Sequence, residues 1–253
     1  MNANDSIKRY SRQIILKEVG GQGQKLLMKS KVLIIGLGGL GSPVLQYLAA
    51  SGVGTIGLAD NDKVDLSNLH RQIIFSLKDI GSYKVSKAKK FISAVNSDIN
   101  VIPYKQKVDL LNVDKIISKY DIIVDCTDNH SSKLIINDAC YRGKKTLVYA
   151  SVSGFFGQVS TFKSFKIDGT GNPYPSYRCL KINQNNEDDC EHLGVLGPIA
   201  GVLGSIQATE VIKQILDEKE NLLGQLLIFD GLSYRMKLIK INWDQNNPLN
   251  GKP

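Results

Sequence analysis

The chain of 253 residues lacks long apolar runs, and no segment approaches the roughly 20 apolar residues that a membrane span requires. Its start, residues 1–6, is polar and has no apolar core of the kind found in a secretory signal. Hydrophobic residues make up 42% and charged residues 22%, a balance that excludes a largely disordered chain. We therefore expect one large globular domain, located in the cytoplasm.

Cysteine is scarce as well. The chain has four cysteines and no C-x-x-C pair, so it carries no zinc-ribbon or thioredoxin-type motif. In a reducing compartment we expect free thiols at all of these positions, which are Cys126, Cys140, Cys179 and Cys190.

Runs of like charge are also absent. The formal net charge is +8, yet no basic run reaches five residues. The scattered lysines indicate compositional drift, or one basic face for an acidic partner, rather than a nucleic-acid-binding surface. We expect neither a nucleic-acid partner nor a membrane partner.

Short apolar runs are present in the first 150 residues, and they alternate with helical patterns. The runs predict strands at 31–36, 55–59, 100–104, 121–125 and 146–150. Helices are predicted between them, including 41–51 and 83–94. Strands that alternate with helices indicate a parallel, doubly wound sheet.

The pattern changes after residue 150. Alternating residues predict antiparallel strands at 157–162, 225–229 and 234–241, with a helix at 198–216. The polar segment 164–194 is predicted to be a functional or mobile loop, and the tail from Asp244 is predicted to fray. The predicted fold class is α/β: a Rossmann-like, doubly wound, mostly parallel sheet extended by antiparallel C-terminal strands. Its expected parts are an N-terminal helical arm (1–30), a nucleotide-binding half (31–150) and a second half (151–243).

A glycine-rich motif follows the first predicted strand and opens a helix. It fits G-x-G-x-x-G, a pattern whose backbone N–H groups approach phosphates, with glycines at Gly36, Gly38, Gly39 and Gly41. Asp60, 19 residues after Gly41 at the end of the next strand, is placed to accept from ribose hydroxyls. The motif predicts nucleotide binding without separating a dinucleotide enzyme from one that uses ATP.

Cations follow this phosphate-binding pattern. Arg71 and Lys84 would each be read as surface charges if they stood alone, but their grouping after a glycine loop favours contact with a phosphate chain. The same region supplies further candidate nucleotide contacts, namely Asp62, Ser67 and Asn68.

The segment DCTDN, residues 125–129, ends the predicted strand 121–125. Asp128 is a candidate Mg²⁺ ligand, because Mg²⁺ takes one or two carboxylates together with phosphate oxygens. Asp128 or Asn129 could instead cap the next helix. The basic motif RYSRQ at 9–13 is uninformative by itself, and Cys190 by itself is better explained as an unreactive thiol than as a nucleophile.

Six segments, taken in order, resemble one family: RYSRQ, VLIIGLGGLGSP, DNDKVDLSNLHRQ, the lysine at 84, DCTDN and CEHLGVLGPIAGVLGSIQATEVIK. The chain resembles the ThiF/MoeB/HesA-type enzymes, which are related to the ubiquitin-activating enzymes. The resemblance implies an adenylyltransferase that uses Mg²⁺ and ATP to activate the C-terminal glycine of a ubiquitin-like sulfur carrier with a Gly-Gly end. The carrier would be of the ThiS (thiamine) or MoaD (molybdopterin) type, with a slight lean to the thiamine type. A cysteine desulfurase or a rhodanese would then supply the sulfur.

The resemblance also implies that residues 151–243 form the carrier-binding half, and it implies roles for individual residues. The loop 36–41 would cradle the nucleotide, Asp60 would hold the ribose and Asp128 would bind Mg²⁺. The phosphate contacts would be Asn68, Arg71 and Lys84. Arg12 matches an arginine finger that reaches the partner subunit's site, which implies a homodimer, and Cys190 matches a loop cysteine implicated in covalent linkage to the carrier.

One departure concerns a structural zinc that the family usually holds with two C-x-x-C pairs. Here the first pair reads Ser176-Tyr177-Arg178-Cys179, and the tail 243–253 has no cysteine. We therefore expect no zinc site, since one thiolate cannot build a tetrahedral site. Two alternatives stay open: a catalytically silent scaffold of the same fold, and an NAD-dependent oxidoreductase.

Overall fold

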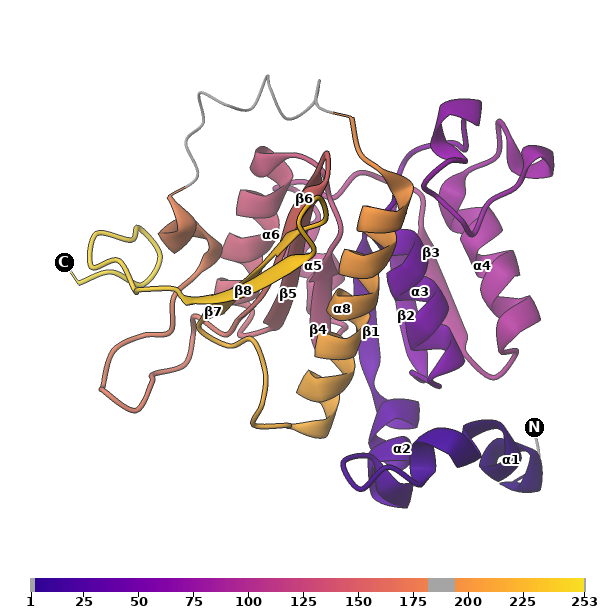
Figure 1. Ribbon diagram of the computed structural model, residues 1–253, viewed down its shortest axis with the longest axis horizontal. Helices are drawn as coiled ribbons and strands as arrows, with labels where there is room; N and C mark the ends of the chain where they lie inside the picture. Colours follow the sequence, from indigo (N-terminus) through magenta and orange to yellow (C-terminus); the bar gives the residue numbers. More distant parts are fainter. Residues whose placement is uncertain (1–2, 182–193, 253) are drawn as a thin grey trace.

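The computed structural model describes residues 3–181 and 194–252, and its strands in these ranges form one eight-stranded sheet (Figure 1). The strand order is β3-β2-β1-β4-β5-β6-β7-β8. The strands are β1 (Lys31–Ile35), β2 (Thr55–Ala59), β3 (Asn100–Tyr104), β4 (Ile122–Asp125), β5 (Thr146–Ser153), β6 (Phe156–Phe162), β7 (Gln225–Asp230) and β8 (Arg235–Lys240). The strands at the start of this order, β3, β2, β1, β4 and β5, run parallel to one another. The remaining strands, β6, β7 and β8, are antiparallel to their neighbours. This arrangement confirms the predicted fold class.

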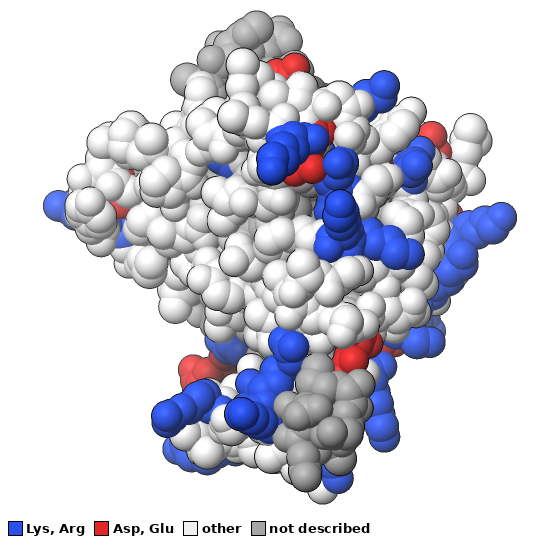
Figure 2. Space-filling model, turned by 90° about the vertical axis from the view of Figure 1, so that its right-hand side faces the viewer, with Lys and Arg blue, Asp and Glu red and all other residues white. Residues whose placement is uncertain are grey.

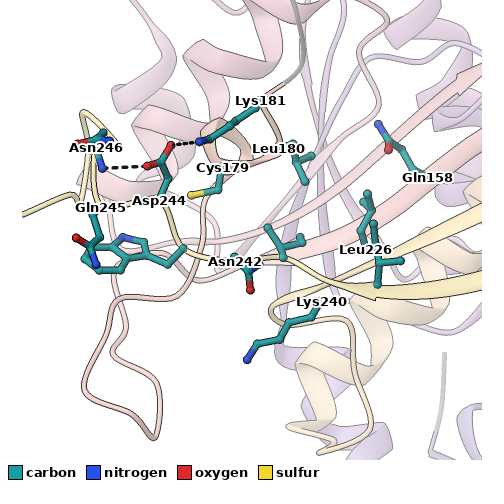
Figure 3. A pocket seen from close by; sticks show the side chains of 13 residues that line it. Gln158, Cys179, Leu180, Lys181, Leu226, Lys240, Asn242, Asp244, Gln245 and Asn246 are labelled. Atoms are coloured by element: carbon teal, nitrogen blue, oxygen red, sulfur yellow. Dashed lines mark hydrogen bonds and ion pairs between the residues drawn. The ribbon is translucent and has the colours of Figure 1, made fainter.

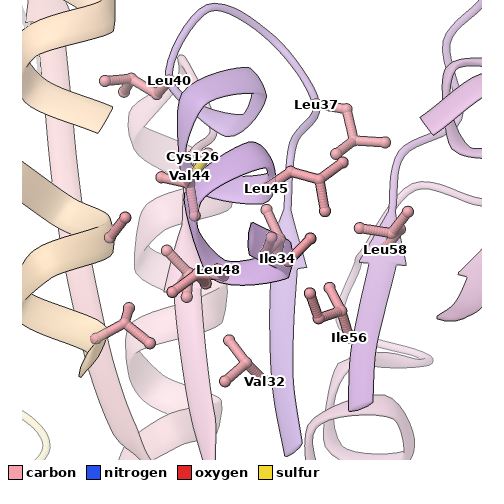
Figure 4. Packing of buried hydrophobic residues seen from close by; sticks show 14 of the residues in the cluster. Val32, Ile34, Leu37, Leu40, Val44, Leu45, Leu48, Ile56, Leu58 and Cys126 are labelled. Carbon is pink, nitrogen blue, oxygen red and sulfur yellow. The ribbon is translucent and has the colours of Figure 1, made fainter. Parts of the chain in front are cut away.

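Helices cover both faces of the sheet. The first face carries α3 (Gly41–Ala50), α4 (Lys84–Val95) and α8 (Gly197–Leu216), and the second carries α5 (Val113–Ile117) and α6 (His130–Arg142) (Figure 1). Alternate side chains of β1 point to the two faces of the sheet. Val32 and Ile34 pack under α3 (Figure 4), whereas Leu33 and Ile35 pack toward α5 and α6. Burial on both faces explains why this strand reads as a continuous apolar run.

The N-terminal helices α1 (Ala3–Ile14) and α2 (Gly20–Lys29) precede β1 and lie at the opposite end of the molecule from the loops that follow β1 and β2 (Figure 1). Tyr10 fixes α1 there, because its buried hydroxyl accepts a hydrogen bond of 2.8 Å from the Asn96 amide. Gln13 adds a hydrogen bond of 2.9 Å to the Ser51 carbonyl.

The C-terminal tail differs from the prediction. Residues 241–252 pack against the body, and Asn247 and Asn250 are buried rather than frayed. The segment 164–181, predicted as part of a mobile loop, contains the short helix η3 (Tyr177–Leu180) and packs beside the tail, while 182–193 lie outside the described residues. In the ranges that the structure describes, no helix is long and apolar enough to cross a membrane.

Candidate active site

The glycine loop 36–41 joins β1 to α3, and its shape depends on two glycines. Gly36 has a φ of 91°, and a Cβ added there would lie 2.7 Å from the Cys126 carbonyl oxygen. A Cβ at Gly41 would lie 2.1 Å from the Gly36 carbonyl oxygen. The loop therefore folds tightly back on itself beside the end of β4, where only glycine fits.

The other two glycines of the motif leave the outer side of the loop open to neighbouring side chains. A Cβ added at Gly38 would have the Gln72 amide nitrogen as its nearest neighbour, at 4.0 Å. One added at Gly39 would lie 3.4 Å from Cγ of Arg71. The structure thus brings Arg71 against the glycine loop, as the sequence predicts.

Asp60 ties the glycine loop to the segment that follows β2. One carboxylate oxygen accepts a hydrogen bond of 2.8 Å from the Leu37 N–H, and the other accepts one of 2.8 Å from the Asp62 N–H. Burial raises the pKa of the Asp60 carboxyl above its usual value, and the positive charge of Lys84 opposes that rise. Each oxygen keeps a second lone pair, so the carboxylate can still accept from ribose hydroxyls.

Lys84, at the first turn of α4, is buried although it is a lysine. Its ammonium lies 3.0 Å from a carboxylate oxygen of Asp62, which is exposed. The pair places a fixed cation close to Asp60, at the carboxyl end of β2. Asp62, predicted to be a nucleotide contact, is thus also the anion that holds Lys84.

The short helix η1 (Leu66–Asn68) positions the polar residues between Asp62 and Arg71. The Asp65 carboxylate caps it by accepting hydrogen bonds from the backbone N–H and the hydroxyl of Ser67, at 2.9 and 2.7 Å. The Asn68 side-chain oxygen accepts from the Asp65 N–H at 3.2 Å. Arg71 Nη1 donates 3.0 Å to the Ser67 carbonyl and lies 2.8 Å from His70 Nε2, so among the described residues the guanidinium is held by neutral groups rather than by an acid.

The loop that carries Asp128 is anchored by the buried carboxylate of Asp125. One of its oxygens accepts from the backbone N–H and the hydroxyl of Thr127, at 2.9 and 2.6 Å. The other lies 3.3 Å from the ammonium of Lys133, which also donates 2.9 Å to the Ala150 carbonyl. Gln207 of α8 donates 2.8 Å to the Asp125 carbonyl. These hydrogen bonds and this ion pair therefore fix the loop at both of its ends.

Asp128 and Asn129 divide the two roles that the sequence left open. The Asn129 side-chain oxygen accepts a hydrogen bond of 2.9 Å from the Ser132 N–H and caps α6. Asp128 is exposed, and one of its carboxylate oxygens accepts a hydrogen bond of 3.3 Å from the Asn129 amide. An exposed carboxylate at the end of a parallel strand, free of a cap role, fits a Mg²⁺ ion that keeps most of its own water.

Two candidate residues do not join this group. Arg12 is exposed on α1, at the far end of the sheet from the glycine loop (Figure 1). A strand of five residues alone spans roughly 16 Å, so Arg12 does not reach the site of its own chain. Cys190 lies outside the described residues. The three described cysteines, Cys126, Cys140 and Cys179, are free thiols as predicted.

Three residues of the site were not predicted from the sequence. Gln72 is 2% exposed, and its side-chain oxygen is buried without a hydrogen-bond partner in the described structure. Its place next to Arg71 was a usable signal. Lys133 and Gln207 gave none, because a charged or amide side chain in a helix is ordinarily exposed.

Comparison with known proteins identifies the family. The sequence model of the ThiF family matches residues 10–249. The chain belongs to the ThiF family. Its fold is shared with a solved structure of E. coli MccB with ATP, with a TM-score of 0.82 and 25% identity over 96% of this chain and 75% of that one.

Curated ThiF relatives are more similar in sequence. A probable molybdopterin-synthase adenylyltransferase of Porphyra purpurea is 42% identical over 92% of this chain and 60% of its own length. The adenylyltransferase and sulfurtransferase MOCS3 of Aedes aegypti is 41% identical over 94% of this chain and 54% of its own. The SAMP-activating enzyme E1 of Haloferax volcanii is 38% identical over 97% of this chain and 89% of its own length. The chain thus spans little more than half the length of several relatives that it matches.

Proposed function

We propose that this ThiF-family chain is an ATP-dependent adenylyltransferase that activates the C-terminal glycine of a ubiquitin-like sulfur carrier. One observation carries the proposal: the glycine loop, Arg71, the Lys84–Asp62 pair and Asp128 meet at the carboxyl edge of β1, β2 and β4. Ligands of open α/β sheets bind at this edge. The names of the relatives, adenylyltransferases and an activating enzyme, point to the same chemistry.

In the proposed reaction, a carboxylate oxygen of the carrier's last glycine attacks the α-phosphorus of ATP, and the bond to the bridging oxygen of pyrophosphate breaks. The product is a mixed anhydride of the carrier and AMP. Loop N–H groups of 36–41 hold the phosphates, and Asp60 orients the ribose. Arg71 and Lys84 stabilise the charge that develops on the leaving pyrophosphate.

Asp128 is the side chain that would hold Mg²⁺, which would supply further neutralisation of the phosphate charge. The contacts of Asp125 with Thr127 and Lys133 anchor the start of the loop that carries this carboxylate, which favours a preorganised site.

The position of Arg12 supports a homodimer with shared sites. The lower lobe of the molecule, formed by the N-terminal helices, carries several exposed Lys and Arg side chains together with a few acidic ones (Figure 2). Because Arg12 is remote from its own glycine loop, it contributes to catalysis only from a second copy. We include this arginine finger in the proposal.

The identity of the carrier is a separate part of the proposal. The named relatives favour a MoaD-type or SAMP-type carrier as the first to test, and a ThiS-type carrier follows. The sulfur donor, a cysteine desulfurase or a rhodanese, would act after adenylation. Residence in the cytoplasm is part of the same proposal.

The test is ATP–pyrophosphate exchange with each candidate carrier. Asp128→Asn should abolish carrier-dependent exchange, whereas Glu220→Gln, which also removes one exposed carboxylate, should leave it unchanged. Exchange that survives Asp128→Asn would remove the Mg²⁺ assignment. Absence of exchange with every carrier would favour the silent scaffold, and carrier-independent reduction of NAD would favour the oxidoreductase.

A further inference from the structure

Two segments meet beyond the antiparallel end of the sheet: residues 163–181, here called the strap, and residues 241–252, here called the tail. Both contribute to the lining of a cavity of about 610 Å³, the strap with residues 179–181 and the tail with residues 241–246 (Figure 3). Lys181 of the strap pairs with Asp244 of the tail at 3.1 Å. Most of the remaining contacts between strap and tail come from asparagine side chains.

This corner is where the family resemblance implies a zinc ion, and the spacing of the strap residues still resembles a metal site. The Ser176 hydroxyl oxygen and the Cys179 sulfur lie 4.0 Å apart. Two thiolates on one tetrahedral zinc lie roughly 3.8 Å apart. The Ser176 N–H also points at the Cys179 sulfur, at 3.4 Å.

The chemistry of the donors does not fit zinc. Zinc takes thiolate, imidazole or carboxylate ligands, usually four of them. Here the strap offers one thiol and one hydroxyl, and the tail offers amides. In the ranges 3–181 and 194–252, no three histidine, cysteine or acidic residues are placed so that they could together hold a metal ion.

We infer that the side chain of Asn247 joins the strap to the tail through hydrogen bonds, in the place where the family resemblance implies a zinc ion. Its amide nitrogen donates hydrogen bonds of 2.8 Å to the Ser176 hydroxyl and 3.1 Å to the Cys179 sulfur. Its two protons are thus used by the two residues that match the family's first C-x-x-C pair. Its oxygen accepts 3.0 Å from the Leu249 N–H within the tail. Asn247 is 5% exposed and Ser176 is fully buried.

A second asparagine completes this asparagine clasp, which comprises Asn247, Asn250 and their partners. The Asn250 amide nitrogen donates 3.0 Å to the carbonyls of both Ser164 and Tyr174 of the strap. Its oxygen accepts 3.2 Å from the Trp243 indole N–H. Both asparagines thus use donor and acceptor atoms, and each joins strap to tail without a charge that needs neutralising.

The clasp predicts a fold that is independent of metal. Purified full-length protein should contain far less than one zinc per chain, and a strong chelator should leave its melting temperature unchanged. Asn247→Ala should lower the melting temperature by roughly 5 °C, because it leaves buried groups without partners. Asn246→Ala, an exposed neighbour, should shift it by less than about 2 °C.

Two further variants separate hydrogen bonding from packing. Asn247→Asp keeps the shape and the acceptor for Leu249 but loses both donors, so it should destabilise about as much as Asn247→Ala. In a Cys190→Ser background, the Cys179 thiol should react faster with a small thiol reagent once Asn247 is replaced, since Cys126 and Cys140 are buried.

About one tightly held zinc per chain, whose removal lowers the melting temperature, would overturn the inference. So would equal effects of Asn247→Ala and Asn246→Ala, or an Asn247→Asp variant as stable as the parent. If Asn247→Ala fails to fold, the zinc content of the parent and the behaviour of Asn247→Asp still decide.

Discussion

The buried pair of Lys133 and Asp125 makes the sharpest prediction about stability. The two side chains are 4% and 1% exposed, and their charged atoms lie 3.3 Å apart under the loop that carries Asp128. Lys133→Met removes the cation while preserving much of its apolar stem. The Asp125 carboxylate then stays buried with only the hydrogen bonds from Thr127.

The expected loss follows from leaving one charge of a buried pair uncompensated. Such a change costs about 3–5 kcal/mol. For a chain of 150–250 residues, 1 kcal/mol corresponds to about 2–4 °C in melting temperature. We therefore expect Lys133→Met to lower the melting temperature by roughly 10 °C. The corresponding free energy is a large part of the unfolding free energy of an ordinary domain.

Denaturant unfolding of four proteins tests this: the parent, Lys133→Met, Asp125→Asn and the double variant. The double variant should be more stable than Lys133→Met, since no bare carboxylate stays buried, and the coupling energy should be about 0.5–3 kcal/mol. Lys115→Met, an exposed lysine on α5, is the matched control and should change stability by less than about 0.5 kcal/mol.

Equal stability of Lys133→Met and Lys115→Met would refute this reasoning. It would mean that removing Lys133 leaves no uncompensated charge in the interior. If the changes in unfolding free energy of the two single variants simply add up in the double variant, the two side chains are not energetically coupled, although both are buried.

Three predictions concern the active site. In the proposed function the ionised carboxylate of Asp60 accepts hydrogen bonds from the ribose, and burial raises the pKa of this carboxyl. ATP affinity should therefore be full above that raised pKa and fall as the pH drops through it, which equilibrium binding between about pH 7 and pH 4 would measure. Asp60→Asn should bind ATP more weakly and lose this part of the pH dependence. Arg71→Ala and Lys84→Ala should each slow carrier-dependent pyrophosphate exchange about 10²–10³-fold, and a loss below tenfold would contradict a role in charge stabilisation. Mixing subunits of Arg12→Ala with subunits of Asp128→Asn should restore roughly a quarter of parental exchange, because each hybrid dimer has one intact shared site. No recovery on mixing, with exchange of subunits verified, would contradict a shared site, and an Arg12→Ala protein that is active before mixing would contradict the arginine finger.

The sheet and the glycine loop were predictable because their signals are local. Apolar runs, the glycine spacing and Asp60 lie within one β-α-β unit, and the structure places them as expected. The choice between Asp128 and Asn129 as helix cap could not be made from sequence, because both residue types suit it. Only the observed hydrogen bond to the Ser132 N–H decides it.

Polar contacts between residues far apart in the sequence could not be predicted from it. The bond from Asn247 to Ser176 joins residues 71 apart in sequence, and nothing in a polar, asparagine-rich tail distinguishes a buried asparagine from an exposed one. The prediction of a frayed tail was wrong for this reason. Likewise, Lys133 was passed over because lysine in a helix is ordinarily solvated, whereas here Asp125 and the Ala150 carbonyl offset its burial.

The most direct test of the proposed function is to observe the product that it requires. A carrier ending in Gly-Gly is incubated with the folded protein, ATP and Mg²⁺, and its intact mass is measured. The proposal predicts a carrier heavier by one AMP group on its C-terminal glycine, formed with release of pyrophosphate and absent with Asp128→Asn. A protein that binds ATP yet leaves every such carrier unmodified would contradict the proposal.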